Sequence, residues 1–176
     1  MNIFVCGGVS PKIKKKFLEG IDTLAKFLVE HGHTITCVGA KTGAIGEIYA
    51  SVKKYGGQAL LMVPDCYEND AFGMDNQMVA MPNLYSMQQF ALKNSKATIV
   101  LPGGNGTLAE LYMTIDNVKS GFDTDPIILF NINGFYDGFK LVEKGLIDAG
   151  VVDKSQDDKV FVCNTPEEIM KIISKM

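Results

Sequence analysis

The sequence predicts an α/β protein with a doubly wound, mainly parallel sheet and helices on both faces. Short apolar segments alternate with longer segments of helical periodicity along the 176-residue chain, and this alternation is typical of βαβ units. The short segments are apolar throughout, as expected for strands that are buried on both faces. No shift in composition marks a linker, so we expect residues 1–176 to form a single domain.

Each predicted element follows from its residue pattern. Six short segments rich in Val, Ile, Leu and Cys are expected to be strands: residues 2–6, 34–38, 58–63, 97–101, 127–131 and 160–163. Six intervening segments have apolar residues at helical spacing: residues 11–31, 44–55, 84–94, 107–120, 135–149 and 166–175.

The connection over residues 64–82 is long for this kind of fold, and long connections in compact domains are often functional. It carries acidic residues and methionines: Asp65, Glu68, Asp70, Asp75, Met74, Met78 and Met81. We interpret it as a rim or lid over a ligand site. The pattern also allows a short strand over residues 77–81, without deciding it. A solvated surface excursion is an equal alternative. Exposed methionines would suit an apolar contact surface.

Glycine-rich turns follow three of the predicted strands, at Gly7-Gly8, at residues 39–46 and at residues 103–106. Ligands of open parallel sheets bind at the carboxyl ends of the strands. The sequence therefore predicts a pocket at one edge of the sheet, lined by the turns at Gly7, Gly43 and Gly103.

The most informative segment is VLPGGNGTLAE at residues 100–110. A strand ends at a Pro-Gly-Gly turn, and a helix is expected to begin near Gly106. Such a junction exposes unpaired amides at the positive end of the helix dipole, which favours a bound phosphate. The predicted phosphate-binding residues are Gly103, Gly104, Asn105, Gly106 and Thr107. Thr107 and Glu110 share one helix face; they would also fit a capping box, and the two roles can coexist.

The motif PGGxGTxxE at residues 102–110 resembles the signature of the LOG (lonely guy) family, long labelled lysine decarboxylases. Characterised members hydrolyse the N-glycosidic bond of nucleoside 5'-monophosphates. Further matches in family order cover nearly the whole chain: residues 4–8 (FVCGG), 43–46 (GAIG), 63–64 (VP), 126–131 and 134–137 (GFYD).

The resemblance implies a Rossmann-like nucleotide-binding domain and a homodimer, and we expect no cofactor. Glu110 is the expected catalytic residue. Gly7, Gly8, Gly43 and Gly46 are expected to shape the nucleotide pocket.

The chain departs from the family in having no arginine, since all 17 basic residues are lysine. The family has a catalytic Arg-Lys pair before the signature strand, and Met87 and Gln88 occupy those positions. Neither side chain can replace the charged, bidentate guanidinium. The candidates that could substitute for it are Gln88, Gln89, Lys93 and Lys41.

Two functions follow from these observations. The first is hydrolysis of a nucleoside 5'-monophosphate to its base and ribose 5-phosphate, with phosphate at residues 103–107 and ribose at Glu110. The second is a catalytically impaired protein that senses or sequesters a nucleotide or a nucleotide-derived signal. The retained Glu110 favours the enzyme, whereas Met87 and Gln88 favour the binding protein.

Composition excludes several other classes. A net charge of −3 argues against nonspecific binding to nucleic acid or to an anionic membrane, and no apolar run is long enough to span a bilayer. The basic cluster at residues 12–16 is interpreted as the solvated start of a helix. The four cysteines form no CxxC pair, so reduced thiols and a cytoplasmic location are expected. His31 and His33 lack further ligands for a metal site.

Overall fold

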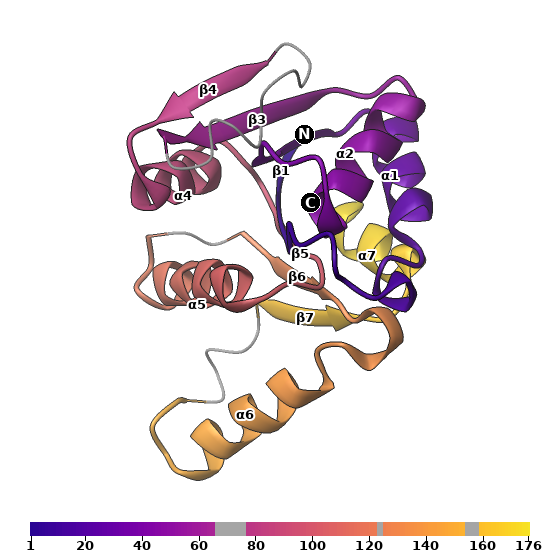
Figure 1. Ribbon diagram of the computed structural model, residues 1–176. Helices are drawn as coiled ribbons and strands as arrows, with labels where there is room; N and C mark the ends of the chain where they lie inside the picture. The colour runs from indigo at the N-terminus through magenta and orange to yellow at the C-terminus, as the bar shows by residue number, and fades with distance from the viewer. Residues whose placement is uncertain (66–76, 123–124, 154–158) are drawn as a thin grey trace.

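A seven-stranded, fully parallel sheet runs through the molecule in the order β4-β3-β2-β1-β5-β6-β7 (Figure 1). The computed structural model describes residues 1–65, 77–122, 125–153 and 159–176. The strands are β1 (Asn2–Cys6), β2 (Thr34–Val38), β3 (Ala59–Pro64), β4 (Met78–Met81), β5 (Thr98–Val100), β6 (Ile127–Phe130) and β7 (Val160–Cys163). The predicted fold class is confirmed.

Helices cover both faces of the sheet. The first face holds α1 (Ile21–Glu30), α2 (Gly43–Lys54) and α7 (Pro166–Ile173), and the second holds α4 (Leu84–Lys93) and α5 (Asn105–Lys119) (Figure 1). Successive side chains of β1 point to opposite faces, so Ile3 and Val5 enter one core and Phe4 and Cys6 the other. The apolar character of β1 is thereby explained, because both of its faces are buried. Within the described ranges, no helix is both long and apolar enough to cross a membrane.

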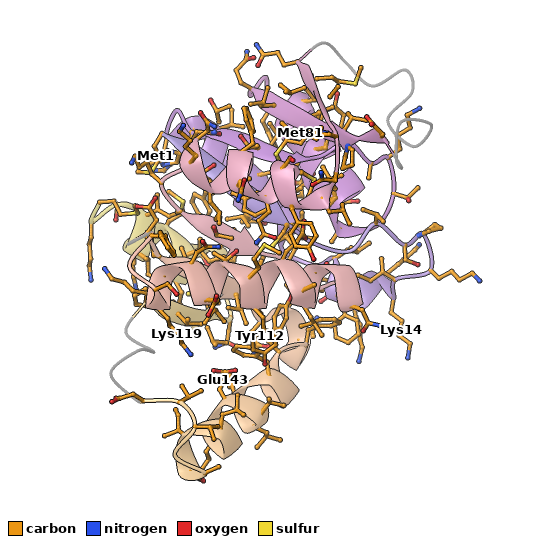
Figure 2. All side chains as sticks on the ribbon, turned by 90° about the vertical axis from the view of Figure 1, so that its left-hand side faces the viewer. Met1, Lys14, Met81, Tyr112, Lys119 and Glu143 are labelled. Atoms are coloured by element: carbon orange, nitrogen blue, oxygen red, sulfur yellow. The ribbon has the colours of Figure 1, made fainter. Side chains whose placement is uncertain are left out.

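Helix α6 (Asp137–Asp148) projects away from the sheet beside α5 (Figures 1 and 2). The Tyr112 hydroxyl of α5 donates a 3.1 Å hydrogen bond to Glu143 Oε1, and the ring of Tyr112 packs against Phe139. Glu143 is the buried residue of α6. The attachment of α6 therefore runs through a few side chains of one helix face.

The N-terminal region corrects one predicted element. The helix expected over residues 11–31 is a 3-10 turn, η1 (Lys15–Phe17), followed by α1 from Ile21. Gly20 separates them with a φ of 82°, a left-handed conformation that suits glycine. The exposed basic cluster, residues 12–16, thus lies before the helix rather than in its first turn.

The short strand that the sequence pattern allowed over residues 77–81 is present as β4 (Met78–Met81). The methionines of this region do not share one environment: Met81 is buried in the core, whereas Met78 is 50% exposed. The expected exposed-methionine surface is therefore wrong for Met81. Met74, Glu68, Asp70 and Asp75, and most of the predicted rim or lid, lie outside the described residues.

The order of the strands explains where a cavity can form. The chain runs outward from β1 through β2 and β3 to β4, and then returns to place β5 on the other side of β1. The connections that leave β1 and β5 consequently diverge to opposite faces of the sheet. Such a switch point leaves a crevice at the carboxyl ends of the two strands.

Candidate functional site

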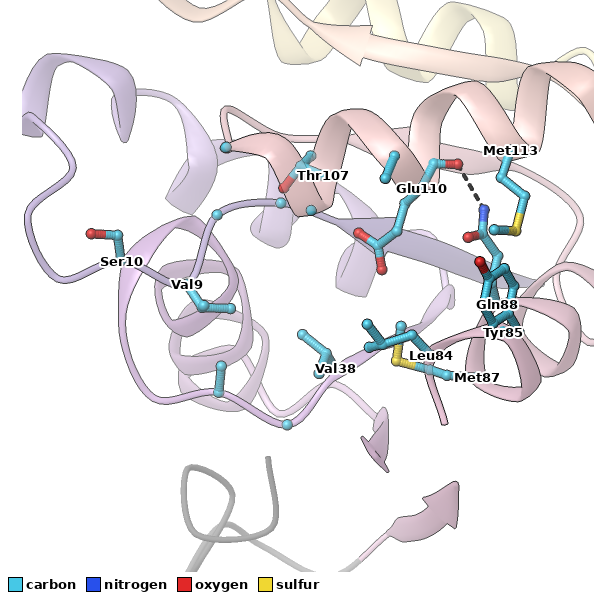
Figure 3. Close-up of a pocket in the computed structure, with 17 residues that line it drawn as sticks. Val9, Ser10, Val38, Leu84, Tyr85, Met87, Gln88, Thr107, Glu110 and Met113 are labelled. Atoms are coloured by element: carbon cyan, nitrogen blue, oxygen red, sulfur yellow. Dashed lines mark hydrogen bonds between the residues drawn. The ribbon is translucent and has the colours of Figure 1, made fainter. Parts of the chain in front are cut away.

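A cavity of about 450 Å³ lies at the carboxyl ends of β1, β2 and β5 (Figure 3). The turns after these strands form one side, and α4 and α5 form the others. Its lining consists of Gly7, Gly8, Val9, Ser10, Val38, Gly39, Ala40, Leu84, Tyr85, Met87, Gln88, Gly104, Gly106, Thr107, Ala109, Glu110 and Met113. None of these residues is basic, so no cationic side chain of the described chain lines the cavity.

The glycine turns pack backbone against backbone. The Gly8 amide donates a 3.0 Å hydrogen bond to Pro102 O, and a Cβ added at Gly103 would lie 2.6 Å from the Gly8 nitrogen. Gly43, with a φ of 71°, leaves no room for a Cβ beside the Gly8 carbonyl. These glycines are required because the turns approach too closely for side chains. Gly43 and Gly103 thus support the Gly8 loop from behind rather than lining the cavity.

The N-terminus of α5 is open toward this cavity. Its N-cap is Gly104, which offers no side chain, and the first helical hydrogen bond runs 3.0 Å from the Leu108 amide to Gly104 O. The amides of Asn105, Gly106 and Thr107 precede that bond and therefore have no partner within the helix. Thr107 is the third helical residue, so the capping-box interpretation is wrong: its hydroxyl does not stand at the N-cap.

Glu110 lies one turn further along α5, and its carboxylate points into the cavity (Figure 3). Burial raises the pKa of this carboxyl from 4.5 to about 7, because the ionised form loses hydration without gaining a cationic neighbour. Near neutral pH the group is consequently divided between its acid and its carboxylate form. A carboxyl with this property can either accept or donate a proton.

Helix α4 forms the opposite wall from neutral side chains. Met87 and Gln88 are 1% and 2% exposed. The Gln88 Nε2 donates to Glu110 O at 2.7 Å and to Thr114 Oγ1 at 2.9 Å, which joins α4 to α5. Leu84 and Tyr85, 48% and 70% exposed, line the same cavity from the first turn of α4.

The structure brings most of the predicted site residues together. Gly7, Gly8, Gly104, Gly106, Thr107, Glu110 and Gln88 line the cavity. Gly46 packs against the Lys41 carbonyl group and, like Gly43 and Gly103, lies outside the lining. Asn105 is exposed at the start of α5.

The candidate replacements for the family arginine are separated. Lys93 and Gln89 line a second cavity, of about 330 Å³, and Lys41 lines neither. Gln88 and Met113 line both cavities and thus form the wall between them. Of the four candidates, Gln88 alone lines the cavity that holds Glu110.

Sequence reasoning missed part of the apolar lining, namely Val38, Ala40, Leu84, Tyr85 and Met113. Met113 carried a usable signal, because it lies three residues after Glu110 and hence on the same helix face. Leu84 and Tyr85 reach the cavity because α4 begins after the carboxyl end of β4 and connects this edge strand to β5 across the second face of the sheet. That order of strands has no local sequence signal.

The fold and this cavity together define a Rossmann-like α/β protein with a cavity at its switch point. The family model described as "Possible lysine decarboxylase" matches residues 45–173. The chain belongs to this family, the LOG family, as its PGGxGTxxE segment predicts.

Curated relatives extend over most of the chain. It is 25% identical over 142 residues to the cytokinin riboside 5'-monophosphate phosphoribohydrolase of Mycobacterium tuberculosis (strain ATCC 25618 / H37Rv), covering 80% of this chain and 76% of the relative. It is 26% identical over 171 residues to the cytokinin riboside 5'-monophosphate phosphoribohydrolase LOG5 of Arabidopsis thaliana, covering 95% and 74%.

Solved structures share the whole fold. A molybdenum cofactor binding protein from the phototrophic bacterium Rippkaea orientalis matches with a TM-score of 0.74 at 17% identity, over 99% of this chain and 95% of that one. The molybdenum cofactor carrier protein of Chlamydomonas reinhardtii matches with a TM-score of 0.71 at 18% identity, over 99% and 96%. At these identities the likeness establishes the fold.

Proposed function

We propose that this protein binds a nucleoside 5'-monophosphate and hydrolyses its N-glycosidic bond, releasing the base and ribose 5-phosphate. One observation carries the proposal: the uncapped N-terminus of α5 and the Glu110 carboxyl face the same cavity, one helical turn apart. The names of the curated relatives, which are phosphoribohydrolases, support the same reaction.

The residues take distinct roles in this proposal. The phosphate binds the amides of residues 104–107, where the helix dipole favours an anion. The ribose then lies next to Glu110. As the glycosidic bond breaks, positive charge develops on the sugar, which the Glu110 carboxylate stabilises. Water supplies the new hydroxyl on the ribose carbon, and its remaining proton goes to the departing base nitrogen.

A second candidate function is nucleotide binding without efficient turnover. Met87 and Gln88 stand where the family has its Arg-Lys pair, and neither supplies a positive charge for the departing base. A positioned acid or base typically contributes about 10²–10⁴ in rate, so its loss would leave binding intact and slow the reaction severely. The names of two structural neighbours, a cofactor binding protein and a carrier protein, support a binding role on this fold.

A panel of nucleoside 5'-monophosphates separates the two functions. Purified protein is incubated with each nucleotide, and both ribose 5-phosphate release and the shift in melting temperature are measured. Release with a shift supports the enzyme, and a shift without release supports the binding protein. Absence of any shift or release with the whole panel contradicts both.

Restoring the family pair gives a second test. If the protein is a binding module because it lacks those charges, the double variant Met87→Arg, Gln88→Lys should raise release above the parent baseline. Replacement of buried Met87 requires the arginine to be held by its new neighbours, so the expected gain is smaller than the loss described above. Met87→Leu with Gln88→Met is the uncharged control.

We also propose a homodimer and a cytoplasmic location. Large apolar side chains are exposed on α4 and α6, including Tyr85 at 70% and Leu141 at 73%, and exposed apolar groups of this size favour self-association. Light scattering during size-exclusion chromatography should give twice the 19.2 kDa mass of one chain. The free, buried thiols Cys6, Cys37 and Cys163 suit a reducing compartment.

A further inference from the structure

The basic cluster of residues 12–16 lies before α1 and outside the cavity lining. Lys12, Lys14 and Lys15 are exposed, and within the described residues their side chains form no hydrogen bond or ion pair. Lys16 differs, because its Nζ lies 4.7 Å from the centroid of an aromatic ring. The three uncompensated positive charges repel one another, and a bound anion relieves that repulsion.

A tight turn places this cluster at the rim of the cavity. Ser10 lines the cavity, and its carbonyl oxygen accepts a 3.3 Å hydrogen bond from the Ile13 amide. The Ser10 hydroxyl accepts a 3.2 Å hydrogen bond from the Lys12 amide. These two bonds fold the chain back on Ser10, so Lys12 stands beside the lining rather than at the end of an extended loop.

The same rim adjoins the start of α5. The Gly8 amide, which precedes Ser10 in the turn after β1, donates a 3.0 Å hydrogen bond to Pro102 O in the turn that leads into α5. Figure 2 shows Lys14 on the side of the molecule where α5 begins and Lys119 on the side where it ends. The cluster therefore lies near the end of the cavity that holds the uncapped amides.

Charge explains what this arrangement suits. In the view of Figure 3, Thr107 lies between Ser10 and Glu110, so the basic rim is on the phosphate side of the proposed site. A helix N-terminus offers about half an elementary charge, whereas a phosphate group carries about two. Because no cationic side chain of the described residues lines the cavity, a second phosphate group has to find its cations at the rim.

We propose that the turn at residues 10–13 and the basic cluster form a second anion subsite, which binds the outer phosphate of a nucleoside 5'-diphosphate. The inference rests on the proposed nucleotide binding and goes further, because it names the phosphate chain that the protein prefers. The inner phosphate lies on the amides at the start of α5, and the outer one passes Ser10 toward Lys12 and Lys14. A nucleoside 5'-diphosphate thus competes with the monophosphate for the same cavity and binds more tightly.

Three ligands with the same base test this preference: adenosine 5'-monophosphate, adenosine 5'-diphosphate and adenosine 3',5'-bisphosphate. The last of these carries its second phosphate at another position and so controls for charge. Dissociation constants are measured by titration calorimetry at low temperature and low salt without divalent metal, with adenine release assayed in parallel to correct for turnover. The 5'-diphosphate should bind about fivefold or more tightly than either of the others, and high salt should reduce this preference.

Two double variants assign the preference to the lysines. Lys12→Gln with Lys14→Gln removes two charges from exposed positions, so the protein should stay folded. The 5'-diphosphate and the 5'-monophosphate should then bind with affinities within about twofold of each other. Lys171→Gln with Lys175→Gln, at exposed positions near the end of α7, removes the same charge and should keep the wild-type ratio.

The outcomes separate this subsite from the function on which it rests. Equal affinities of the wild-type protein for the 5'-monophosphate and the 5'-diphosphate, with both bound, would overturn the subsite and leave nucleotide binding intact. Binding of the 3',5'-bisphosphate as tightly as the 5'-diphosphate would overturn it as well, because charge alone would then explain the preference. So would a preference that persists in the folded Lys12→Gln, Lys14→Gln protein. Failure of all three nucleotides to bind would overturn the proposed function and this inference together.

Discussion

The two helices that border the cavity begin in opposite ways. Helix α4 starts behind Asn83, whose Oδ1 accepts a 2.9 Å hydrogen bond from the Ser86 amide. Helix α5 starts after its N-cap Gly104, which has no side chain that could accept a hydrogen bond. The first helix satisfies one of its free amides from its own sequence, and the second has no capping side chain for its first amides.

The two walls differ in charge as well. The α5 wall combines the positive end of a helix dipole with a partly ionised Glu110, and the α4 wall presents Met87 and a neutral Gln88. In the proposed function, the phosphate and ribose would therefore lie at the α5 wall and the base at the α4 wall. Among the described residues, no cationic side chain lines the cavity, so the proposed phosphate would be held by backbone amides.

The largest expected effect is on catalysis at the α5 wall. Glu110→Gln should lower ribose 5-phosphate release about 10²-fold or more while nucleotide binding largely persists, because the charge that stabilises the transition state is lost and the side-chain volume is kept. Asp116→Asn, at an exposed position of the same helix, should change neither. If the parent shows turnover that Glu110→Gln retains in full, the catalytic role of Glu110 is wrong.

The next largest expected effect is on anion binding at the N-terminus of α5, where we propose that the phosphate binds. A Cβ added at Gly104 meets nothing within 4 Å, and Gly104 lines the cavity, so Gly104→Val should leave the protein folded and block the anion. The rise in melting temperature with nucleotide, or with inorganic phosphate, should disappear. Gly145→Val in α6, another position with open space, should keep that rise. Normal stabilisation of the Gly104→Val protein would show that the phosphate binds elsewhere.

Protonation of Glu110 predicts how stability depends on pH. The folded-state pKa of about 7 is raised above the ordinary value of 4.5, so the folded state binds more protons between these pH values. The stabilisation that protonated Glu110 gives the folded state is complete below about pH 4.5 and is lost as the pH rises through 7. Between pH 5 and pH 8 the wild-type protein should lose on the order of 2 kcal/mol relative to Glu110→Gln. Denaturant unfolding of both proteins at the two pH values measures this, and parallel pH profiles would contradict it.

The smallest expected effect is on stability, through the Asn83 N-cap of α4. Asn83→Ala removes the cap of α4 and should lower the free energy of unfolding by about 1 kcal/mol, with no change in phosphate affinity. Asn83→Ser, which keeps a capping oxygen, should recover most of the stability. A loss of phosphate affinity in Asn83→Ala would mean that both helix starts contribute to anion binding.

Local patterns were sufficient to predict the strand end, the glycine turn and the start of α5. Residues 102–110 combine the end of a strand, a glycine turn and a helix start within nine positions, so their mutual geometry is set by short-range backbone conformation. The same reasoning placed the strands correctly. It failed at residues 11–31, where the 3-10 turn η1 ends at Phe17 and α1 begins only after its N-cap Gly20. The apolar spacing continues across this break, which only the backbone conformation reveals.

By itself, the sequence determined the parallel α/β class, the open turn before α5, the position of Glu110 and the absence of arginine. Only the tertiary structure decided which residues meet across the cavity. Gln88 and Glu110 are 22 positions apart, and their contact depends on α4 and α5 packing side by side. That packing also decided that the Gln88 amide is held by Glu110 O and Thr114 Oγ1 and that Gly43 and Gly103 act as supports. The physical reason is that hydrogen-bond partners and close backbone approaches between distant segments arise when the sheet brings them together, and no local residue pattern encodes them.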